Sequence, residues 1–325
     1  MYSLKDNHNR FFSYLRLSIT ELCNFQCKYC LPNNLKYPNK NYLTLNEINN
    51  LIIAFTELGV NKIRITGGEP TLRHDFVNIG KLLSSFNNIK SVVFTSNGYK
   101  LSEIITDVVN AGYTGVNISL DSLNEKKFNF ITNRKYFNKV FEGILYALKS
   151  KLTVKINIVL SDLFSLDDFE DFYSFIKYKN ITIRFINQME TNTIKKKFNF
   201  YLNLKFLLNF LKNNNWILKK SIYKGSSGPA LVFNNTQFLG EIGIINPYSN
   251  SFCLSCNRLR ISPYGELFLC LFGGKSYSVR HLLDSCNKKD MLKQFLIDKI
   301  KFKSYSHFLD DNNFGKITSF SSIGG

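Results

Sequence analysis

Apolar and polar positions follow two patterns that alternate from residue 14 to about residue 187. Short runs rich in apolar and β-branched residues predict six strands, at 15–19, 62–66, 91–95, 115–120, 153–160 and 181–186. Longer stretches with apolar residues at helical spacing predict helices between them, for example at 44–58, 102–111, 137–149 and 166–176. Thr44 and Glu47 have the spacing of a capping box at the start of the first helix.

This alternation of strand and helix predicts a parallel sheet. Right-handed crossovers place the loops that follow the strands at one end of the sheet, where active sites form. A complete barrel needs eight repeats, so six repeats predict an α/β fold with an open, partial (β/α)6 barrel of the TIM type. After about residue 187 the pattern becomes irregular, and we expect this tail to cap the open side or mouth of the barrel. The predicted division is an N-terminal segment at 1–12, the partial barrel at 13–187 and a C-terminal region at 188–325.

Three cysteines stand close together after the first predicted strand, at Cys23, Cys27 and Cys30. A [4Fe–4S] cluster normally takes one thiolate on each iron, so three thiolates leave one iron open to a small molecule. Zinc is the alternative, although zinc sites more often combine a C-x2-C pair with a distant second pair. A chance group of buried thiols is a poor explanation for three of seven cysteines within eight residues.

A second set of three cysteines lies far along the chain, with the spacing C-x2-C-x13-C. Its members are Cys253, Cys256 and Cys270. Taken alone this set also suits zinc, and Cys286 could be a fourth ligand, although a free cysteine packed as a small apolar residue is commoner. Arg258 and Arg260 follow Cys256 closely. Arginines in that place suit a phosphorylated or otherwise anionic substrate, unless they are solvated surface charges.

A glycine-rich sequence, Gly67-Gly68-Glu69-Pro70, follows the predicted strand at 62–66. Alone it is typical of a turn. Together with C-x3-C-x2-C it resembles the second signature of the radical S-adenosylmethionine (SAM) superfamily. The resemblance implies that the open iron binds the amino and carboxylate groups of SAM and that the glycines help to hold the amino group. An electron from the reduced cluster then cleaves SAM to a 5′-deoxyadenosyl radical.

Further pieces resemble one family within that superfamily, the MoaA-type GTP 3′,8-cyclases of molybdenum cofactor biosynthesis. The pieces are CNFQCKYC at 23–30, RITGGEP at 64–70, TSNG at 95–98, NISLDSL at 117–123, KIN at 155–157, RFI at 184–186, CxxCNRLR at 253–260 and a terminal Gly-Gly. The resemblance extends from about Tyr14 to the last residue. It implies a lyase that converts GTP to (8S)-3′,8-cyclo-7,8-dihydroguanosine 5′-triphosphate, with the 5′-deoxyadenosyl radical removing the C3′ hydrogen.

The resemblance also implies two [4Fe–4S] clusters, SAM as cofactor and a role for each matching residue. The implied cluster ligands are Cys23, Cys27, Cys30, Cys253, Cys256 and Cys270. The implied SAM contacts are Tyr29, Gly68, Ser119 and Met189. The implied GTP contacts are Arg16, Arg64, Thr95, Lys155, Arg258 and Arg260. The implied catalytic residues are Arg258, Arg260, Gly324 and Gly325, the last two in a tail that enters the active site.

Several of these residues also have ordinary structural explanations. Met189 could serve packing alone. Ser119 could be a helix cap, and the terminal glycines could be a frayed end. Arg16 and Arg64 lie in strand patterns, where an inward-facing charge is costly without a partner. An anionic ligand inside the barrel would supply that partner, which favours function for these two arginines.

The net charge of +18 would suit a nucleic-acid partner, but Lys and Arg are scattered and the aromatic residues, mostly Phe, follow the apolar pattern of a core. A positive field also attracts a triphosphate. No apolar run is long enough to span a bilayer, and the first ten residues lack the apolar centre of a signal peptide. We therefore expect no nucleic-acid or membrane partner, and a cytoplasmic location that keeps thiols reduced.

The implied partners are GTP, an electron donor such as flavodoxin or ferredoxin, a second copy in a homodimer, and a cyclic pyranopterin monophosphate synthase that acts downstream. Two rival functions remain open. One is a two-cluster radical SAM enzyme that modifies a peptide or protein, which would have no need of Arg258 and Arg260. The other is a zinc or nucleic-acid binding protein without SAM cleavage.

Overall fold

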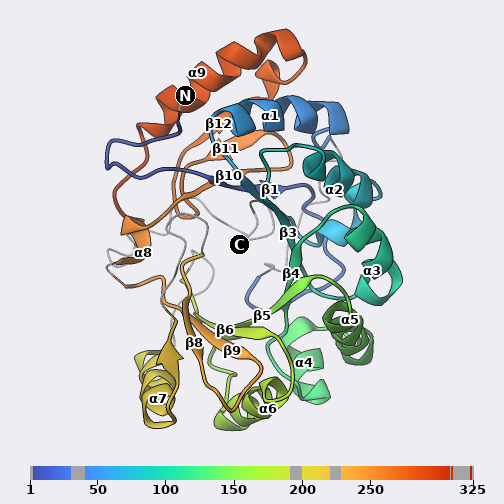
Figure 1. Ribbon diagram of the computed structural model, residues 1–325, viewed down its shortest axis with the longest axis vertical. Coiled ribbons are helices and arrows are strands. Elements are labelled where there is room, and N and C mark those ends of the chain that lie inside the picture. Colours follow the sequence, from blue (N-terminus) through green and yellow to red (C-terminus); the bar gives the residue numbers. More distant parts are fainter. Residues whose placement is uncertain are drawn as a thin grey trace.

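The structure is a computed structural model that describes residues 3–30, 41–190, 200–219, 228–249, 251–307, 309 and 323. One curved sheet runs through the described chain, in the order β12-β11-β10-β1-β2-β3-β4-β5-β6-β9-β8-β7 (Figure 1). The strands are β1 (Tyr14–Ser18), β2 (Lys62–Thr66), β3 (Ser91–Ser96), β4 (Gly115–Ser119), β5 (Thr153–Leu160), β6 (Thr182–Asn187), β7 (Ile217–Leu218), β8 (Leu231–Asn234), β9 (Glu241–Ile245), β10 (Arg258–Ile261), β11 (Glu266–Phe268) and β12 (Ser276–Ser278).

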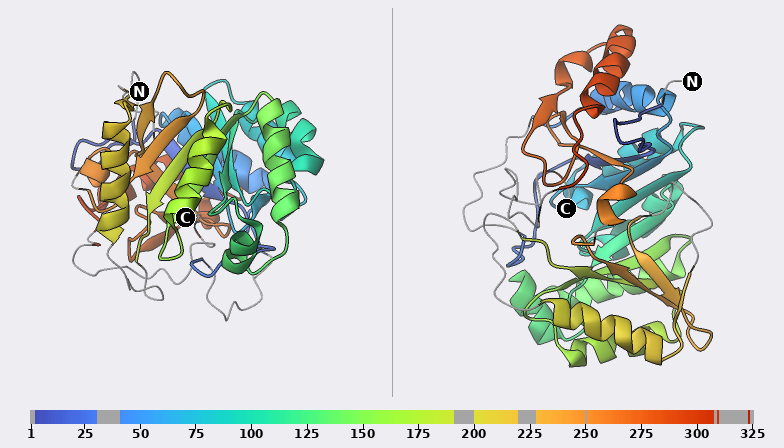
Figure 2. Two further views of the ribbon diagram at one scale, coloured as in Figure 1. Left: turned by 90° about the horizontal axis from the view of Figure 1, so that it is seen from below. Right: turned by 90° about the vertical axis from the view of Figure 1, so that its left-hand side faces the viewer.

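Helices cover the outer, convex face of this sheet (Figure 1). They are α1 (Leu45–Glu57), α2 (Phe76–Ser84), α3 (Leu101–Asn110), α4 (Glu125–Thr132), α5 (Phe137–Lys149), α6 (Leu166–Ile176), α7 (Phe200–Asn213) and α9 (Lys289–Ile300). The short helix α8 (Ser251–Leu254) lies instead at the open side of the barrel (Figure 1). The predicted capping box is present, since the Thr44 side chain accepts from Glu47 N and the Glu47 carboxylate accepts from Thr44 N. Helix α9 lies beside α1, so the end of the described chain packs against its beginning (Figure 2).

The six predicted strands are β1 to β6, displaced by at most one residue at either end, and the open partial barrel is confirmed. The tail differs from our expectation, because it adds strands to both edges of the sheet. β10 pairs in parallel with β1, and β9 pairs in parallel with β6, so the parallel part holds eight strands. Six strands alone would leave two edges of unpaired N–H and C=O groups, which the tail strands satisfy. The ends at β12 and β7 do not pair with one another, which leaves the barrel open.

Apolar side chains between the strands and the helices form the core, and the inner face of the sheet is polar. Val154, Ile156 and Ile158 of β5 are buried under the helices, whereas Lys155 and Asn157 between them face the interior. This alternation follows from the two-residue period of a strand. Among the described residues, no helix is both long enough and apolar enough to cross a membrane.

Candidate active site

Three neighbouring strands present a basic row to the interior of the barrel. In register, Tyr14 of β1 lies between Arg258 of β10 and Lys62 of β2. Two residues further on, Arg16 lies between Arg260 and Arg64. Residues two apart on a strand share a face, so all six side chains point the same way. The parallel pairing of β10, β1 and β2, which are far apart in sequence, therefore brings these positive charges together on one face of the sheet.

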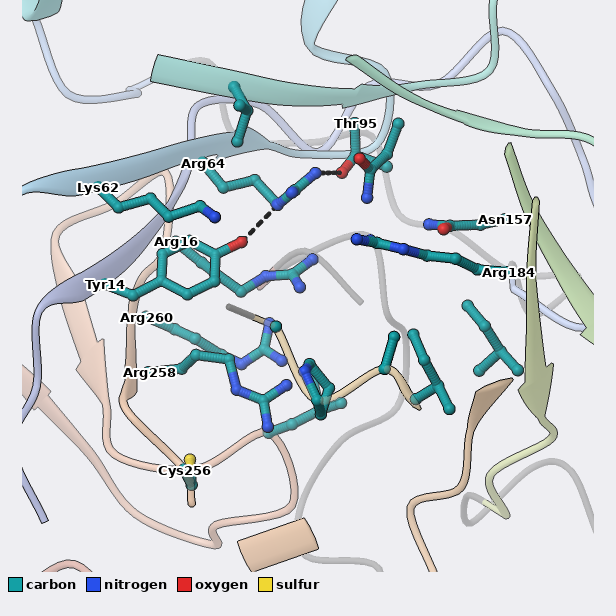
Figure 3. A pocket seen from close by; sticks show the side chains of 18 of the residues that line it. Tyr14, Arg16, Lys62, Arg64, Thr95, Asn157, Arg184, Cys256, Arg258 and Arg260 are labelled. Atoms are coloured by element: carbon teal, nitrogen blue, oxygen red, sulfur yellow. Dashed lines mark hydrogen bonds between the residues drawn. The ribbon is translucent and has the colours of Figure 1, made fainter. Parts of the chain in front are cut away.

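These side chains line a pocket of about 550 Å³. Figure 3 shows the arginines pointing into it, with Arg184 of β6 reaching in from the opposite wall. Other lining residues include Thr95, Lys155, Cys253, Cys256 and Cys270. None of the described residues that line this pocket is Asp or Glu. A pocket with this many cations and no carboxylate is suited to a polyanion.

The guanidinium of Arg64 is held by two neighbours. Its Nε donates to Tyr14 Oη, and its Nη1 donates to Thr95 Oγ1 at 3.2 Å (Figure 3). Burial alone would raise the pKa of Tyr14, but the charges of Arg64 and Arg16 lower it to about 7. Such a shift reflects the positive charges that surround this phenol.

Other cations in the pocket respond to the same field. Burial, followed by the charge of Arg184, lowers the pKa of Lys155 to about 8. Burial and Arg258 lower the pKa of Arg260 to about 10. The Nε of Arg184 is buried and makes no hydrogen bond within the described structure. An anion bound in the pocket would stabilise the charged form of each of these groups.

A second pocket, of about 210 Å³, lies against the first cysteine set. Its lining includes Cys23, Cys27, Tyr29, Cys30, Gly67, Gly68 and Ser119. Four residues line both pockets, namely Thr95, Asn157, Ile186 and Met189. The two cysteine sets therefore face adjoining pockets that share one wall. A reactive group formed at one set could reach a molecule held beside the other.

Buried acidic side chains hold the loop that carries the first cysteine set. Tyr29 Oη donates to Asp121 Oδ2 at 2.5 Å, and Val159 N donates to Asp121 Oδ1 at 2.8 Å. Burial raises the pKa of Asp121 to about 6, even though these hydrogen bonds lower it. Asn97 Nδ2 donates to Asn24 Oδ1 at 2.8 Å, and Asn97 N donates to the buried Glu69 at 2.6 Å. The loop is thus anchored on both sides of Cys27.

Gly67 and Gly68 are needed where the glycine-rich turn meets the start of the cysteine loop. A Cβ on Gly68 would lie 2.4 Å from Leu22 O and 2.5 Å from Glu21 O. A Cβ on Gly67 would lie 2.5 Å from Thr20 O. Backbone hydrogen bonds join the same segments, with Gly68 N donating to Thr20 O at 2.9 Å. These glycines allow the close backbone approach that positions the loop.

The thiols of both cysteine sets are chemically suited to bind iron–sulfur clusters. Burial raises the pKa of Cys23 to about 11 and that of Cys30 to about 12, so these thiols ionise at neutral pH only with a metal bound. Burial also acts on Cys256, but Lys303 and Arg258 lower its pKa to about 7. In the described ranges no three Cys, His, Asp or Glu side chains group closely enough to hold a single metal ion. A four-iron cluster is wider than one ion and keeps its thiolates farther apart.

Comparison with known proteins identifies the class first. The Radical SAM superfamily model matches residues 17–176, and the Molybdenum Cofactor Synthesis C model matches residues 181–309. Two solved structures share the fold. Streptococcus suis SuiB bound to S-adenosylmethionine has a TM-score of 0.66 at 16% identity, covering 91% of this chain and 69% of that chain. Native anSMEcpe with bound AdoMet has a TM-score of 0.58 at 17% identity, covering 90% of this chain and 84% of that chain. The chain thus has the radical SAM fold, which implies SAM and a [4Fe–4S] cluster as cofactors.

Relatives then give the particular family. A GTP 3′,8-cyclase of Psychromonas ingrahamii is 42% identical over 99% of this chain and 95% of that protein. One of Mannheimia succiniciproducens is 39% identical over 99% and 96%. One of Haemophilus influenzae strain Rd is 40% identical over 99% and 96%. The chain belongs to the GTP 3′,8-cyclase family, radical SAM enzymes of molybdenum cofactor biosynthesis.

The structure brings the described candidate residues together at the two pockets. Six residues predicted for GTP line the larger pocket, namely Arg16, Arg64, Thr95, Lys155, Arg258 and Arg260. Four predicted for SAM line the smaller one, namely Tyr29, Gly68, Ser119 and Met189. Gly324 and Gly325 lie outside the described residues. Their neighbour Ile323 is buried, and its carbonyl accepts from Arg260 Nη1 at 3.4 Å.

Sequence reasoning missed several polar residues of the larger pocket, among them Tyr14, Lys62 and Arg184. Each occupies an inward-facing position of a strand. Lys62 precedes Arg64 by two residues, and Tyr14 precedes Arg16 by two, so the two-residue period could have found both. Arg184 carried the same signal, since a charge inside an apolar strand is unusual without a partner.

Proposed function

We propose that this protein binds GTP in the larger pocket and SAM in the smaller one, and forms (8S)-3′,8-cyclo-7,8-dihydroguanosine 5′-triphosphate. One observation carries the proposal. The two pockets share a wall at Thr95, Asn157, Ile186 and Met189, with one cysteine set on each side. The pocket on the GTP side is basic and contains no carboxylate among its described lining residues. When bound, the cofactors supply the 5′-deoxyadenosyl radical that removes the C3′ hydrogen.

The proposed roles of the basic residues follow from where they lie. Arg16, Arg64 and Lys155 bind the triphosphate, because their charges are buried and close together. Arg258 and Arg260 lie within the span of the second cysteine set, shortly after Cys256, and hold the guanine end. Thr95 accepts from Arg64 and keeps that guanidinium aimed into the pocket. Fixed cations of this kind position the substrate and exclude competing geometries.

The proposed SAM contacts come from four separate elements. Tyr29 lies between two of the cysteines, and its hydroxyl is already bonded to Asp121. Gly68 follows β2, Ser119 ends β4 and Met189 follows β6. All four lie at the carboxyl ends of parallel strands, the end where such barrels bind ligands. They hold SAM beside the open iron of a cluster on Cys23, Cys27 and Cys30.

We further propose that Cys253, Cys256 and Cys270 hold a second [4Fe–4S] cluster with one iron free for the guanine base. The described thiols all face the larger pocket, and a thiolate-only ligand set favours iron–sulfur or zinc over harder metals. Gly324 and Gly325 enter the same pocket. The burial of Ile323 and its contact with Arg260 support that path for the tail.

Other parts of the proposal concern organisation and partners. The chain divides into an N-terminal segment at 1–12, a partial barrel at 13–187 and an auxiliary-cluster region at 188–325. It acts in the cytoplasm as a homodimer and receives electrons from flavodoxin or ferredoxin. Its product passes to a cyclic pyranopterin monophosphate synthase. The chemistry supports an electron donor, since cleavage of SAM needs one electron.

The test is an anaerobic assay of reconstituted protein with GTP, SAM and dithionite, read by mass spectrometry. We expect 5′-deoxyadenosine together with a cyclised GTP product, and loss of the product in Arg258→Ala or Arg260→Ala. Deoxyadenosine without a GTP product would contradict the substrate and turn the search to peptides. Neither product, from protein that holds about eight irons, would contradict the activity itself.

A further inference from the structure

The N-terminal segment is built into the fold close to the second cysteine set. Residues 3–12 fold back on themselves, with Phe12 N donating to Leu4 O at 2.9 Å, and both side chains are buried in the core. The segment also holds a buried ion pair, in which Arg10 Nε lies 2.6 Å from Asp6 Oδ2. The two side chains are 7% and 0% exposed. A buried charge pair is costly unless its remaining donors and acceptors are satisfied, so the other contacts of these two side chains matter.

The free end of Arg10 reaches two other segments. Its Nη1 donates to Cys253 O at 2.9 Å and to Tyr305 O at 3.0 Å, and its Nη2 donates to Ser304 O at 2.6 Å. The ion pair with Asp6 fixes the orientation of the Arg10 guanidinium, so its Nη1 and Nη2 point toward these carbonyls. One side chain thus joins the N-terminal segment, the backbone of the candidate cluster ligand Cys253, and the residues that follow α9.

Lys303 makes the corresponding contact on the other side of the cysteine set. It is 4% exposed, and its Nζ donates to Leu269 O, the carbonyl directly before Cys270. The ammonium also lies 5.4 Å from the centre of the Phe12 ring, in the N-terminal segment. No carboxylate forms an ion pair with Lys303 within the described residues. Because its Nζ contacts the residue directly before Cys270, its charge lies beside the second cysteine set.

We propose that Arg10 and Lys303 are positioning residues for the second cysteine set. They fix the backbone at Cys253 and before Cys270, and Lys303 adds a buried positive charge without an ion-pair partner among the described residues beside the anionic cluster that these thiolates carry. The inference rests on the proposed second cluster. Hydrogen bonds and charges around a cluster set its stability and its reduction potential. Nearby cations favour the reduced, more negative form.

The test uses full-length protein in which Cys23, Cys27 and Cys30 are replaced by Ala, so that any iron reports on the second set alone. In this background we compare Arg10→Met, Arg10→Lys, Lys303→Met and Lys303→Arg. The readouts are iron per chain, the electron paramagnetic resonance signal of the reduced cluster, its midpoint potential and the rate of iron loss to a chelator. None of them depends on turnover.

We expect both Met variants to lose iron about tenfold faster or more, as outer-shell partners of metal ligands typically do when removed. The midpoint potential should fall in both. Lys303→Arg should keep the potential, because it keeps the charge. Arg10→Lys should keep most of the potential but lose iron faster, because a lysine cannot replace the fork that spans three carbonyls.

Arg73 provides a matched control for a merely structural role. It is a buried arginine that pairs with Asp75 at 2.6 Å and donates to Ile19 O and Leu43 O, away from the second set. Arg73→Met should lower the unfolding temperature without changing the iron-loss rate or the potential. Unchanged iron loss and potential in Arg10→Met and Lys303→Met would overturn this inference alone. A background that binds no iron would overturn the second cluster as well.

Discussion

Tyr29 Oη donates a hydrogen bond of 2.5 Å to Asp121 Oδ2, and this contact ties the first cysteine loop to the end of β4. The carboxylate is only 7% exposed, and its other oxygen accepts from Val159 N. One oxygen of this buried carboxylate thus binds the cysteine loop, and the other binds the sheet. The arrangement fixes the aromatic ring that stands between Cys27 and Cys30.

Tyr29→Phe tests this contact. Removing the hydroxyl leaves a buried carboxylate with one partner fewer, so we expect the free energy of unfolding to fall by about 1–3 kcal/mol. The affinity for SAM should also fall, because the loop loses its anchor. Denaturant unfolding and calorimetric titration with SAM measure the two effects. Tyr146→Phe is the control, since that ring is 46% exposed and its change should alter neither.

Gly68→Ala should disturb the loop through its backbone. The new Cβ would meet Leu22 O at 2.4 Å and Glu21 O at 2.5 Å, so one segment must move. We expect a loss of about 1–3 kcal/mol of stability and incomplete binding of the first cluster. Gly274→Ala makes the matched comparison, because nothing lies within 4 Å of its added Cβ. Equal iron content and equal stability in the two variants would contradict the steric argument.

Arg184→Met should weaken GTP binding while leaving SAM binding intact. The side chain reaches into the larger pocket from β6, and its buried Nε has no hydrogen-bond acceptor in the described structure. A charge-assisted hydrogen bond is worth about 1.5–3 kcal/mol, so we expect GTP affinity to fall by about tenfold or more. Anaerobic equilibrium dialysis measures both ligands. Arg280→Met, which instead removes an ion pair with Glu47, should bind GTP normally.

GTP affinity should depend on pH through Lys155. Burial, Arg184 and Lys62 lower its pKa to about 8, so the ammonium of the ligand-free protein loses its proton as the pH rises through that value. A bound polyanion favours the charged form and raises the pKa. Binding must then take up a proton above about pH 8, and affinity should fall by up to about tenfold per pH unit there.

Titrations of GTP at several values between about pH 8 and 10 measure this dependence. Tyr14, whose pKa is about 7, is already ionised throughout that range. Lys155→Met should bind GTP more weakly at pH 7 and show a flatter profile. A variant profile as steep as that of the unmodified protein would assign the proton to another group.

Removal of Gly324 and Gly325 should abolish the GTP product while both clusters and SAM cleavage remain. Ile323, which precedes the two glycines, is buried, and its carbonyl accepts from Arg260, a residue that lines the larger pocket. Iron analysis and the deoxyadenosine yield check that only the GTP side is affected. Full cyclisation by the truncated protein would show that the tail has no part in the reaction.

Strand positions were predictable because each strand has a strong local signal. The run at 62–66 is confirmed residue for residue as β2, and its apolar period comes from side chains that must be buried. The tail was not predictable in the same way. β9 and β10 are short and derive their stability from pairing with β6 and β1, which are far away in sequence. Local pattern holds no information about such partners.

The sequence by itself determined the chemistry of the candidate site. Two sets of three cysteines, a glycine-rich turn and an Arg-x-Arg pair are local features, and they point to thiolate metal ligands beside an anion site. Only the tertiary structure decided what these features face. The parallel pairing of β10 with β1 sets Arg260 beside Arg16, and it turns both cysteine sets toward one shared wall. Side-chain burial and the field of distant charges exist only once the strands have paired. The same long-range contacts bring Arg184 and Lys303 to the larger pocket and Arg10 to the backbone of Cys253.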